Sequence, residues 1–153
     1  MAIIEQKLKE MGIELRPLEV PTANYLHAKV FGDLIYCSGA APVKDGKHLY
    51  NGKLGKDVTV EQGYDAAREA AINLLSVLKF ELGDLDRVTS VVKLLGFIAS
   101  ADDFYSQPAV MNGAPDLMVA VFGEAGKHAR AAIGTNTLPG NLPVEIEMIA
   151  QFK

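Results

Sequence analysis

The stretches His128-Ala-Arg-Ala-Ala-Ile-Gly-Thr-Asn-Thr-Leu-Pro139 and Val144-Glu-Ile-Glu-Met-Ile-Ala-Gln-Phe152 decide the fold. The first predicts a strand of small side chains from Ala129 to Asn136. The second alternates between apolar and other residues, which is the period of a strand with one buried face. On that strand Glu145 and Glu147 share one face, and the opposite face carries Val144, Ile146, Met148 and Phe152.

A long amphipathic helix is predicted from about residue 60 to residue 82. Thr59-Val-Glu-Gln62 matches a capping box at its start, and Gly83 ends the apolar pattern. Between them the apolar residues keep a spacing of three or four positions over five turns. They are Tyr64, Ala67, Ala71, Leu74, Leu75, Leu78 and Leu82.

Three shorter elements are expected before this helix. Residues 26–31 and 34–37 predict two strands, because Gly32-Asp33 is a two-residue turn between apolar, β-favouring segments. Residues 2–11 predict a short amphipathic helix that packs outside the core, with Gly12 as its left-handed cap. The chain therefore opens with a helical extension and a hairpin.

A strand and a second helical region follow the long helix. Val88 to Ile98 is rich in β-branched and aliphatic residues and predicts a buried strand. Ser100-Ala-Asp-Asp-Phe104 is expected to start a helical region that runs to Phe122, its adjacent carboxylates acting as solvated caps. Pro108 and Pro115 are expected at breaks or first-turn positions, so the region divides into two pieces.

The element order β-β-α-β-α-β-β implies an α+β fold. We expect one domain over residues 1–153, with a mixed sheet, both helices on one face and each helix linking neighbouring strands. A chain of this length buries roughly 68–70% of the surface that its unfolded form exposes. The sheet face opposite the helices must then be covered by something else.

Charge and composition exclude several classes of protein. Fifteen Lys and Arg against nineteen Asp and Glu give a net charge of −4 without a basic run, which argues against nucleic-acid binding. The beginning of the sequence lacks the pattern of a secretory signal, and no apolar run approaches the ~20 residues of a membrane span. We expect a cytoplasmic protein with no nucleic-acid or membrane partner.

The reactive side chains form no metal or nucleophile motif. His27, His48 and His128 are isolated, and neither a serine elbow nor a phosphate-binding loop occurs. Cys37, the single cysteine, lies in an apolar stretch and is interpreted as a small buried hydrophobe. We therefore expect no metal site.

Arg130 is the most informative polar residue, because it stands among alanines on an expected strand. Its guanidinium needs acceptors, while its small neighbours leave open space, and such a space suits a carboxylate ligand. A buried ion pair with Glu145 or Glu147 on an adjacent strand is the alternative that these residues leave open.

Together these segments resemble the reactive intermediate deaminase (Rid, or YjgF-like) family over about residues 13–152. The most specific part of the resemblance is Arg-x-Ala-x-x-x-x-x-Leu-Pro followed by Val-Glu-Ile-Glu at this separation. The N-terminal helix extension, residues 2–12, resembles one bacterial branch of the family. The other matching segments are Tyr25 to Pro42 with Ser38-Gly39-Ala-Ala-Pro42, Ala67-Arg68 with Asn73-Leu74, and Gly83-Asp-Leu-Asp-Arg-Val88.

The resemblance implies a chorismate-mutase-like fold and a homotrimer whose sheets form a central barrel, with ligand clefts between subunits. It also implies hydrolysis of 2-imino or 2-enamino acids to 2-oxo acids and ammonia, without cofactor or metal. By position, Arg130 matches the arginine that binds the substrate carboxylate, Glu145 the glutamate associated with water, Tyr25 a cleft tyrosine and Gly39 a backbone donor.

Two positions depart from the family pattern. Ala132 stands where archetypal members often carry a cleft cysteine, and the region from Asn112 to Phe122 aligns only with a gap. The equivalent of the family's helix asparagine is therefore left unassigned. A noncatalytic trimer that binds a small carboxylate as a sensor or effector is the alternative function. A ribonuclease role is disfavoured by the net charge and by the lack of a visible His/Lys acid-base cluster.

Overall fold

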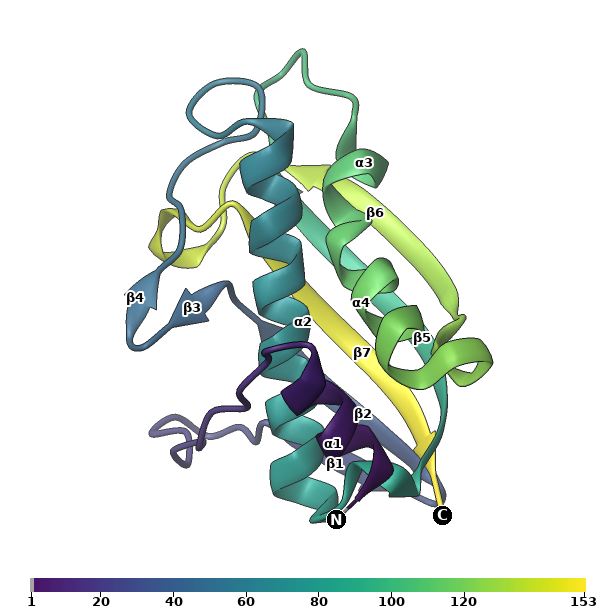
Figure 1. Ribbon diagram of the computed structural model, residues 1–153. Helices are drawn as coiled ribbons and strands as arrows, with labels where there is room; N and C mark the ends of the chain where they lie inside the picture. The colour runs from purple at the N-terminus through teal and green to yellow at the C-terminus, as the bar shows by residue number, and fades with distance from the viewer. Residues whose placement is uncertain (1) are drawn as a thin grey trace.

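The computed structural model describes residues 2–153 as a five-stranded sheet with its helices on one face (Figure 1). The strands of this sheet are β1 (Ala28–Phe31), β2 (Leu34–Ala40), β5 (Val88–Ala99), β6 (Ala129–Thr135) and β7 (Val144–Phe152). The helices are α1 (Ile3–Glu10), α2 (Val60–Leu82), α3 (Gln107–Met111) and α4 (Gly113–Phe122). Short 3-10 turns are η1 (Leu85–Arg87), η2 (Gly123–Gly126) and η3 (Pro139–Asn141), and β3 (Val43–Lys44) pairs with β4 (Lys47–His48).

The strand order is β1-β2-β7-β5-β6, and only β5 and β6 run parallel. This confirms the predicted α+β class with a mixed sheet. The expectation that each helix links neighbouring strands is right for α3 and α4, which connect β5 to β6. It is wrong for α2, because the C-terminal strand β7 inserts between β2 and β5 and pairs antiparallel with both.

The predicted long helix is confirmed at both ends. The Thr59 hydroxyl accepts from the Gln62 N–H at 3.2 Å, and the Gln62 side chain accepts from the Thr59 N–H at 3.0 Å. Gly83 has φ +76° at the C-terminus, a conformation that favours glycine. The buried stripe of α2 packs on the sheet and fixes the helix across β7 and β2 (Figure 1).

The N-terminal helix docks on the surface as expected, and Gly12 takes the expected left-handed conformation after it, with φ +71°. Another element caps its N-terminal end. The Asp86 carboxylate in η1 accepts from the backbone N–H groups of Ile3 and Ile4, each at 2.8 Å. The bonds from Ile4 and then Ile3 hold the pKa of Asp86 below its usual 3.8, because they favour the charged form. Leu8 provides the buried anchor of α1 in the core.

The expected helix start at residues 100–104 is wrong. The Ser100 N–H donates to Thr135 and the Ala101 N–H donates to Leu54, both at 2.9 Å, so the chain stays extended there. The Ser100 hydroxyl bonds back to the Ile98 carbonyl, and the adjacent carboxylates 102–103 lie exposed in a turn, away from any helix start. The helix begins instead at α3, and the expected division into two pieces is confirmed.

No element among residues 2–153 covers the sheet face opposite the helices (Figure 1). A hollow of about 360 Å³ lies on that face, where Tyr36 and Leu95 accompany three charged side chains. Its charged residues are Lys29, Lys93 and Glu147. The bare face is the physical reason for expecting further copies of the chain on it, and the trimer stays a prediction.

Candidate functional site

The residues singled out in the sequence, together with Asn112, form two groups in the structure. The arginine half consists of Arg130 and Asn112, and the glutamate half consists of Tyr25, Gly39 and Glu145. The arginine half lies at the β6 edge of the sheet, and the glutamate half lies where β2 meets β7.

Arg130 lies on the edge strand and on the face that the helices cover. It pairs in register with Leu94 of β5, whose side chain is buried beneath the helices. Its Nη1 donates to Oδ1 of Asn112 at 2.6 Å, while the residue remains exposed. This is the one hydrogen bond of its side chain within residues 2–153. Since a guanidinium carries five N–H donors, most of them are left to receive a ligand.

Asn112, to which the sequence assigns no role, is the residue that the structure places on Arg130. It stands at the junction of α3 and α4, and its position is fixed by the approach of Gly113 to α2. A Cβ on Gly113 would collide with the backbone oxygen of Tyr64, so only glycine lets the helices meet there. The Asn-Gly pair between two proline-containing helices was the available signal, but the contact with Arg130 depends on tertiary packing.

Gly39 and Glu145 are in direct contact across β2 and β7. A Cβ built on Gly39 would lie 2.5 Å from Oε1 and 2.9 Å from Cδ of Glu145, closer than a real side chain allows. The ladder between these strands shifts register between Cys37 and Ala40, which takes Gly39 out of regular pairing. The missing side chain therefore makes room for the carboxylate.

Tyr25 shares a cavity with Gly39. The cavity has a volume of about 480 Å³ and lies beside the β1–β2 hairpin, with Arg16 and Asn73 in its wall. The Tyr25 side chain is 57% exposed and sits in the loop that leads into β1. Tyr25, Gly39 and Glu145 thus belong to one region of the surface.

Within one chain Arg130 and Glu145 do not meet. Strand β5 separates β6 from β7, and Arg130 pairs with Leu94 while Glu145 pairs with Phe97. Positions three apart on a strand face opposite sides of the sheet, so the two side chains point to different faces. The alternative of an ion pair from Arg130 to Glu145 or Glu147 is wrong: the strands are not adjacent, and within residues 2–153 no such pair forms.

Cys37 has the environment expected of a packing residue. It is 6% exposed, and burial, with a further contribution from the charge of Glu81, raises the pKa of its thiol to about 12. A thiol with such a pKa is protonated at neutral pH and is a poor nucleophile. Cys37 is therefore interpreted as a packing residue of strand β2.

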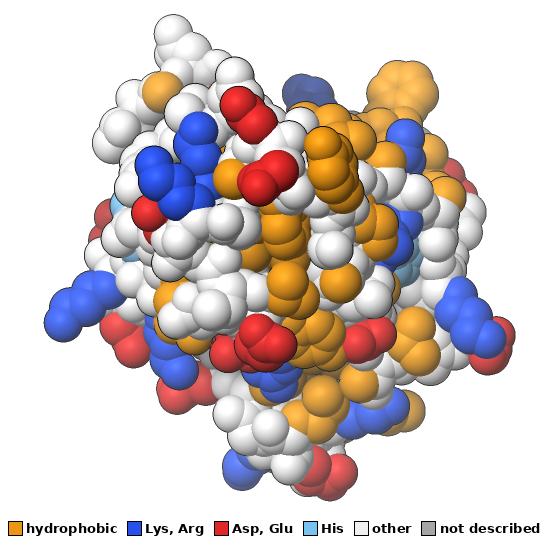
Figure 2. Space-filling view, turned by 90° about the horizontal axis from the view of Figure 1, so that it is seen from above, with side chains coloured by type: hydrophobic (Ala, Val, Ile, Leu, Met, Phe, Trp, Pro, Cys, Tyr) orange, Lys and Arg blue, Asp and Glu red, His pale blue; other side chains and the backbone are white. Residues whose placement is uncertain are grey.

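Residues 2–153 contain neither a cluster of potential metal ligands nor a helix that could cross a membrane. Across residues 2–153, no three His, Cys, Asp or Glu side chains gather as a metal-binding group. None of the helices in this range has the length and apolar character that a bilayer crossing requires. Figure 2 shows basic and acidic side chains interspersed around an apolar band, so that face lacks a surface of one charge sign.

Known proteins match nearly the whole chain. A family profile described as "YjgF/chorismate mutase-like, putative endoribonuclease" matches residues 5–151. Protein TCP17 of Trypanosoma cruzi is 39% identical over 150 residues, covering 97% of this chain and 94% of that protein.

Two solved structures have nearly the same fold. Protein Atu1372 of Agrobacterium tumefaciens, of unknown function, superposes with a TM-score of 0.92 at 42% identity, covering 99% of this chain and 94% of its own. A protein of Shewanella oneidensis MR-1 with the same endoribonuclease description gives a TM-score of 0.93 at 33% identity, covering 97% and 99%.

Proposed function

Because the chain belongs to the YjgF/chorismate mutase-like family, we propose that its copies assemble so that the arginine half of one meets the glutamate half of another. The resulting cleft hydrolyses small 2-imino or 2-enamino acids to 2-oxo acids and ammonia. One observation carries this proposal: each chain presents two accessible half-sites of complementary chemistry that it cannot bring together by itself.

The arginine half is suited to bind the carboxylate of the substrate. A guanidinium offers two parallel N–H groups to a carboxylate, and Asn112 holds Arg130 through one further N–H at 2.6 Å. Ala132, half-buried two residues along the same strand face, adds no bulk that would fill the space beside the guanidinium. The acid group of the ligand is therefore fixed at the sheet edge.

The glutamate half is suited to handle water and protons. Water attacks the imine carbon while the nitrogen gains a proton, and the carbinolamine then loses ammonia to leave the 2-oxo acid. A 2-enamino acid first takes a proton on carbon 3 and loses one from nitrogen, which gives the imine. Glu145 hydrogen-bonds the attacking water or the leaving amine, and the Gly39 backbone lies beside it.

The assembly we expect is a homotrimer. The bare sheet face must be covered, and three such faces turned inward form a closed barrel interior. Arg130, on the edge strand β6, then lies at the contact with a neighbouring copy. An endoribonuclease activity is disfavoured, because a net charge of −4 and the interspersed charges on the face shown in Figure 2 are unsuited to binding a phosphate backbone.

The test is release of ammonia from an imine generated in situ by an amino acid oxidase. We expect wild-type protein to accelerate release over buffer and Arg130→Ala to abolish the acceleration. Arg87→Ala is the matched control, because Arg87 bonds the carbonyls of Lys153 and Leu82 far from both halves. Tight binding of pyruvate without acceleration identifies the protein as a carboxylate sensor and refutes the enzymatic proposal.

A further inference from the structure

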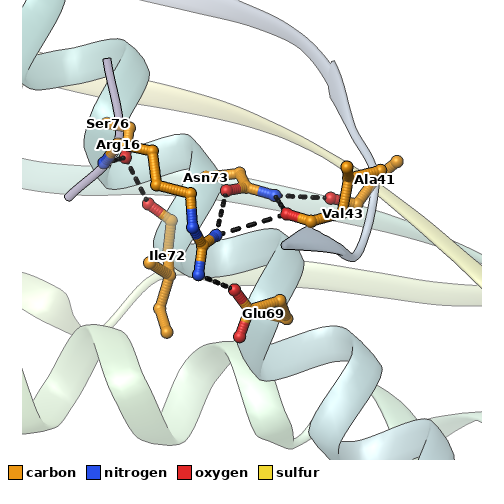
Figure 3. A network of polar contacts seen from close by, with 7 residues as sticks. All are labelled: Arg16, Ala41, Val43, Glu69, Ile72, Asn73 and Ser76. Atoms are coloured by element: carbon orange, nitrogen blue, oxygen red, sulfur yellow. Dashed lines mark hydrogen bonds and ion pairs between the residues drawn. The ribbon is translucent and has the colours of Figure 1, made fainter. Parts of the chain in front are cut away.

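The segment between α1 and β1 contributes an arginine to the wall of the Tyr25–Gly39 cavity. The backbone N–H of Arg16 donates to the Ser76 hydroxyl at 3.1 Å, which ties this segment to α2. The Arg16 side chain then runs between α2 and the chain that follows β2, where it meets three groups (Figure 3). Its Nη1 donates to Asn73 Oδ1 at 2.8 Å and to the Val43 carbonyl at 3.2 Å.

Asn73 of α2 extends the same network toward the glutamate half. Its side-chain nitrogen donates to the carbonyl oxygens of Ala41 at 2.7 Å and Val43 at 2.9 Å (Figure 3). Arg16 and Asn73 thus converge on the backbone two to four residues after Gly39. The Val43 carbonyl accepts from both side chains, so neither can shift without loosening the other.

A buried charge holds Arg16 in this place. Glu69, on α2, is a residue only 7% exposed, and its carboxylate forms an ion pair with Nη2 of Arg16. A buried carboxylate without a cation is strongly destabilising, so Glu69 selects the one geometry in which the guanidinium reaches it. Charge-assisted bonds of this kind are shorter and stronger than neutral ones. The network is therefore a stiff support.

The Arg16–Asn73 network holds the backbone next to Gly39, where there is no room for a larger residue. Gly39 already lies so close to Glu145 that a single added carbon would collide with the carboxylate. A shift of the backbone after Gly39 therefore changes the placement of its N–H relative to Glu145. Arg16 and Asn73 also line the cavity in which Tyr25 lies, so the same change alters the cavity wall.

We propose that Arg16 is a positioning residue for the glutamate half. Through Asn73 and the Val43 carbonyl it fixes the backbone from Gly39 to Val43, and this sets the affinity of the cleft for its ligand. The guanidinium of Arg16 is already engaged by Glu69, Asn73 and the Val43 carbonyl, so Arg16 acts through these groups. This inference rests on the proposed function, and it makes the segment before β1 a working part of the site.

The test uses two variants, because loss of Arg16 alone leaves Glu69 unpaired and endangers folding. The double variant Arg16→Gln/Glu69→Gln removes both charges together, and Arg16→Lys keeps the cation but loses the two-acceptor fork. Arg87→Gln is the matched control, since Arg87 also ties backbone carbonyls together and lies over the ring of Phe152, away from the cavity.

Three readouts separate positioning from mere stability. We expect the double variant to move the amide NMR resonances of Gly39 and Ala41 and to weaken pyruvate binding about 5- to 100-fold, since displacements near 1 Å carry effects of that order. KM for the imine should rise more than kcat falls, and Arg16→Lys should restore melting temperature more fully than affinity. Arg87→Gln should lower melting temperature and leave resonances and affinity unchanged.

The measurements distinguish failure of the Arg16 inference from failure of the proposed function. Unmoved Gly39 and Ala41 resonances in the double variant overturn the inference, as do moved resonances with wild-type pyruvate affinity. If wild-type protein neither binds pyruvate nor releases ammonia, the proposed function fails on its own. The amide resonances still decide whether Arg16 positions this backbone: moved resonances support that part of the inference, and unmoved ones overturn it.

Discussion

Gly39→Ala is the sharpest perturbation that the structure offers, because it adds one carbon against one carboxylate. The new Cβ would lie 2.5 Å from Oε1, 2.9 Å from Cδ and 3.0 Å from Cγ of Glu145, whereas ordinary contact begins at 3.4 Å. Gly39 does not have a positive φ, so alanine brings no backbone strain there. The carboxylate must therefore retreat by nearly 1 Å, and its partly exposed side chain can do so by rotation.

This geometry predicts a small loss of stability and a large loss of turnover. Overpacking of a closed core costs about 1–3 kcal/mol, and the mobility of Glu145 places this variant at the lower end. A catalytic group displaced by 1 Å can lose about 10²-fold in rate. We expect ammonia release to fall by roughly that factor, while the melting temperature falls by only a few degrees.

The assay is ammonia release at a temperature where circular dichroism shows the variant folded. Glu145→Asp in the Gly39→Ala background is the companion variant, because the shorter side chain relieves the collision without returning the carboxylate to its place. It should regain stability and stay inactive. Full turnover in Gly39→Ala would refute the reasoning, since the position of Glu145 would then not matter to the chemistry.

The remaining predictions concern both halves, the thiol, the N-terminal helix and the assembly. Arg130→Ala should weaken pyruvate binding, measured by calorimetry, by ~2–5 kcal/mol, and Arg130→Lys should restore it only in part. Glu145→Gln should lower the turnover rate by roughly 10²–10⁴ and leave the affinity for pyruvate nearly unchanged. Cys37→Ala should keep activity within a few-fold, because a thiol with a pKa of about 12 takes no part in proton transfer at neutral pH; lost activity with an intact fold would contradict this. Since the pKa of Asp86 is lowered in the folded state, its contribution is complete above the usual value of 3.8 and disappears as pH falls through the folded value. Amide exchange of Ile3 and Ile4 should accelerate in that acid range, and Asp86→Asn should show the fast exchange already at neutral pH. Sedimentation equilibrium should give a trimer, and a stable monomer at micromolar concentration would contradict the assembly.

The elements that the sequence predicted well are those whose signal is local. The capping box at Thr59 and the alternation from Val144 to Phe152 each fix an element through neighbouring residues alone. The start of α3 was missed because the backbone at Ser100 and Ala101 bonds to Thr135 of β6 and to Leu54, and the Ser100 hydroxyl bonds to the Ile98 carbonyl. These long-range bonds keep the chain extended, and no local sequence pattern indicates them. The β3–β4 ribbon was missed because two-residue strands carry no periodicity.

The order of the strands in the sheet could not be predicted either, because it too depends on contacts between distant segments. Alternation on the C-terminal strand shows which side chains share a face, but it does not identify the neighbouring strands. The insertion of β7 between β2 and β5 brought Glu145 against Gly39 and removed it from the strand that carries Arg130. The residues of the proposed site thus come from the resemblance to a family, while their division into two halves required the topology.

That division explains why so small a set of side chains is sufficient. An exposed arginine and a carboxylate on opposite sheet faces do little in an isolated chain, because water screens each of them. In the assembly that we propose, a second copy covers both side chains, and Arg130, held by Asn112, binds the carboxylate of the ligand and not that of Glu145. An ion pair between the two within one chain would have satisfied both charges and left neither for the reaction.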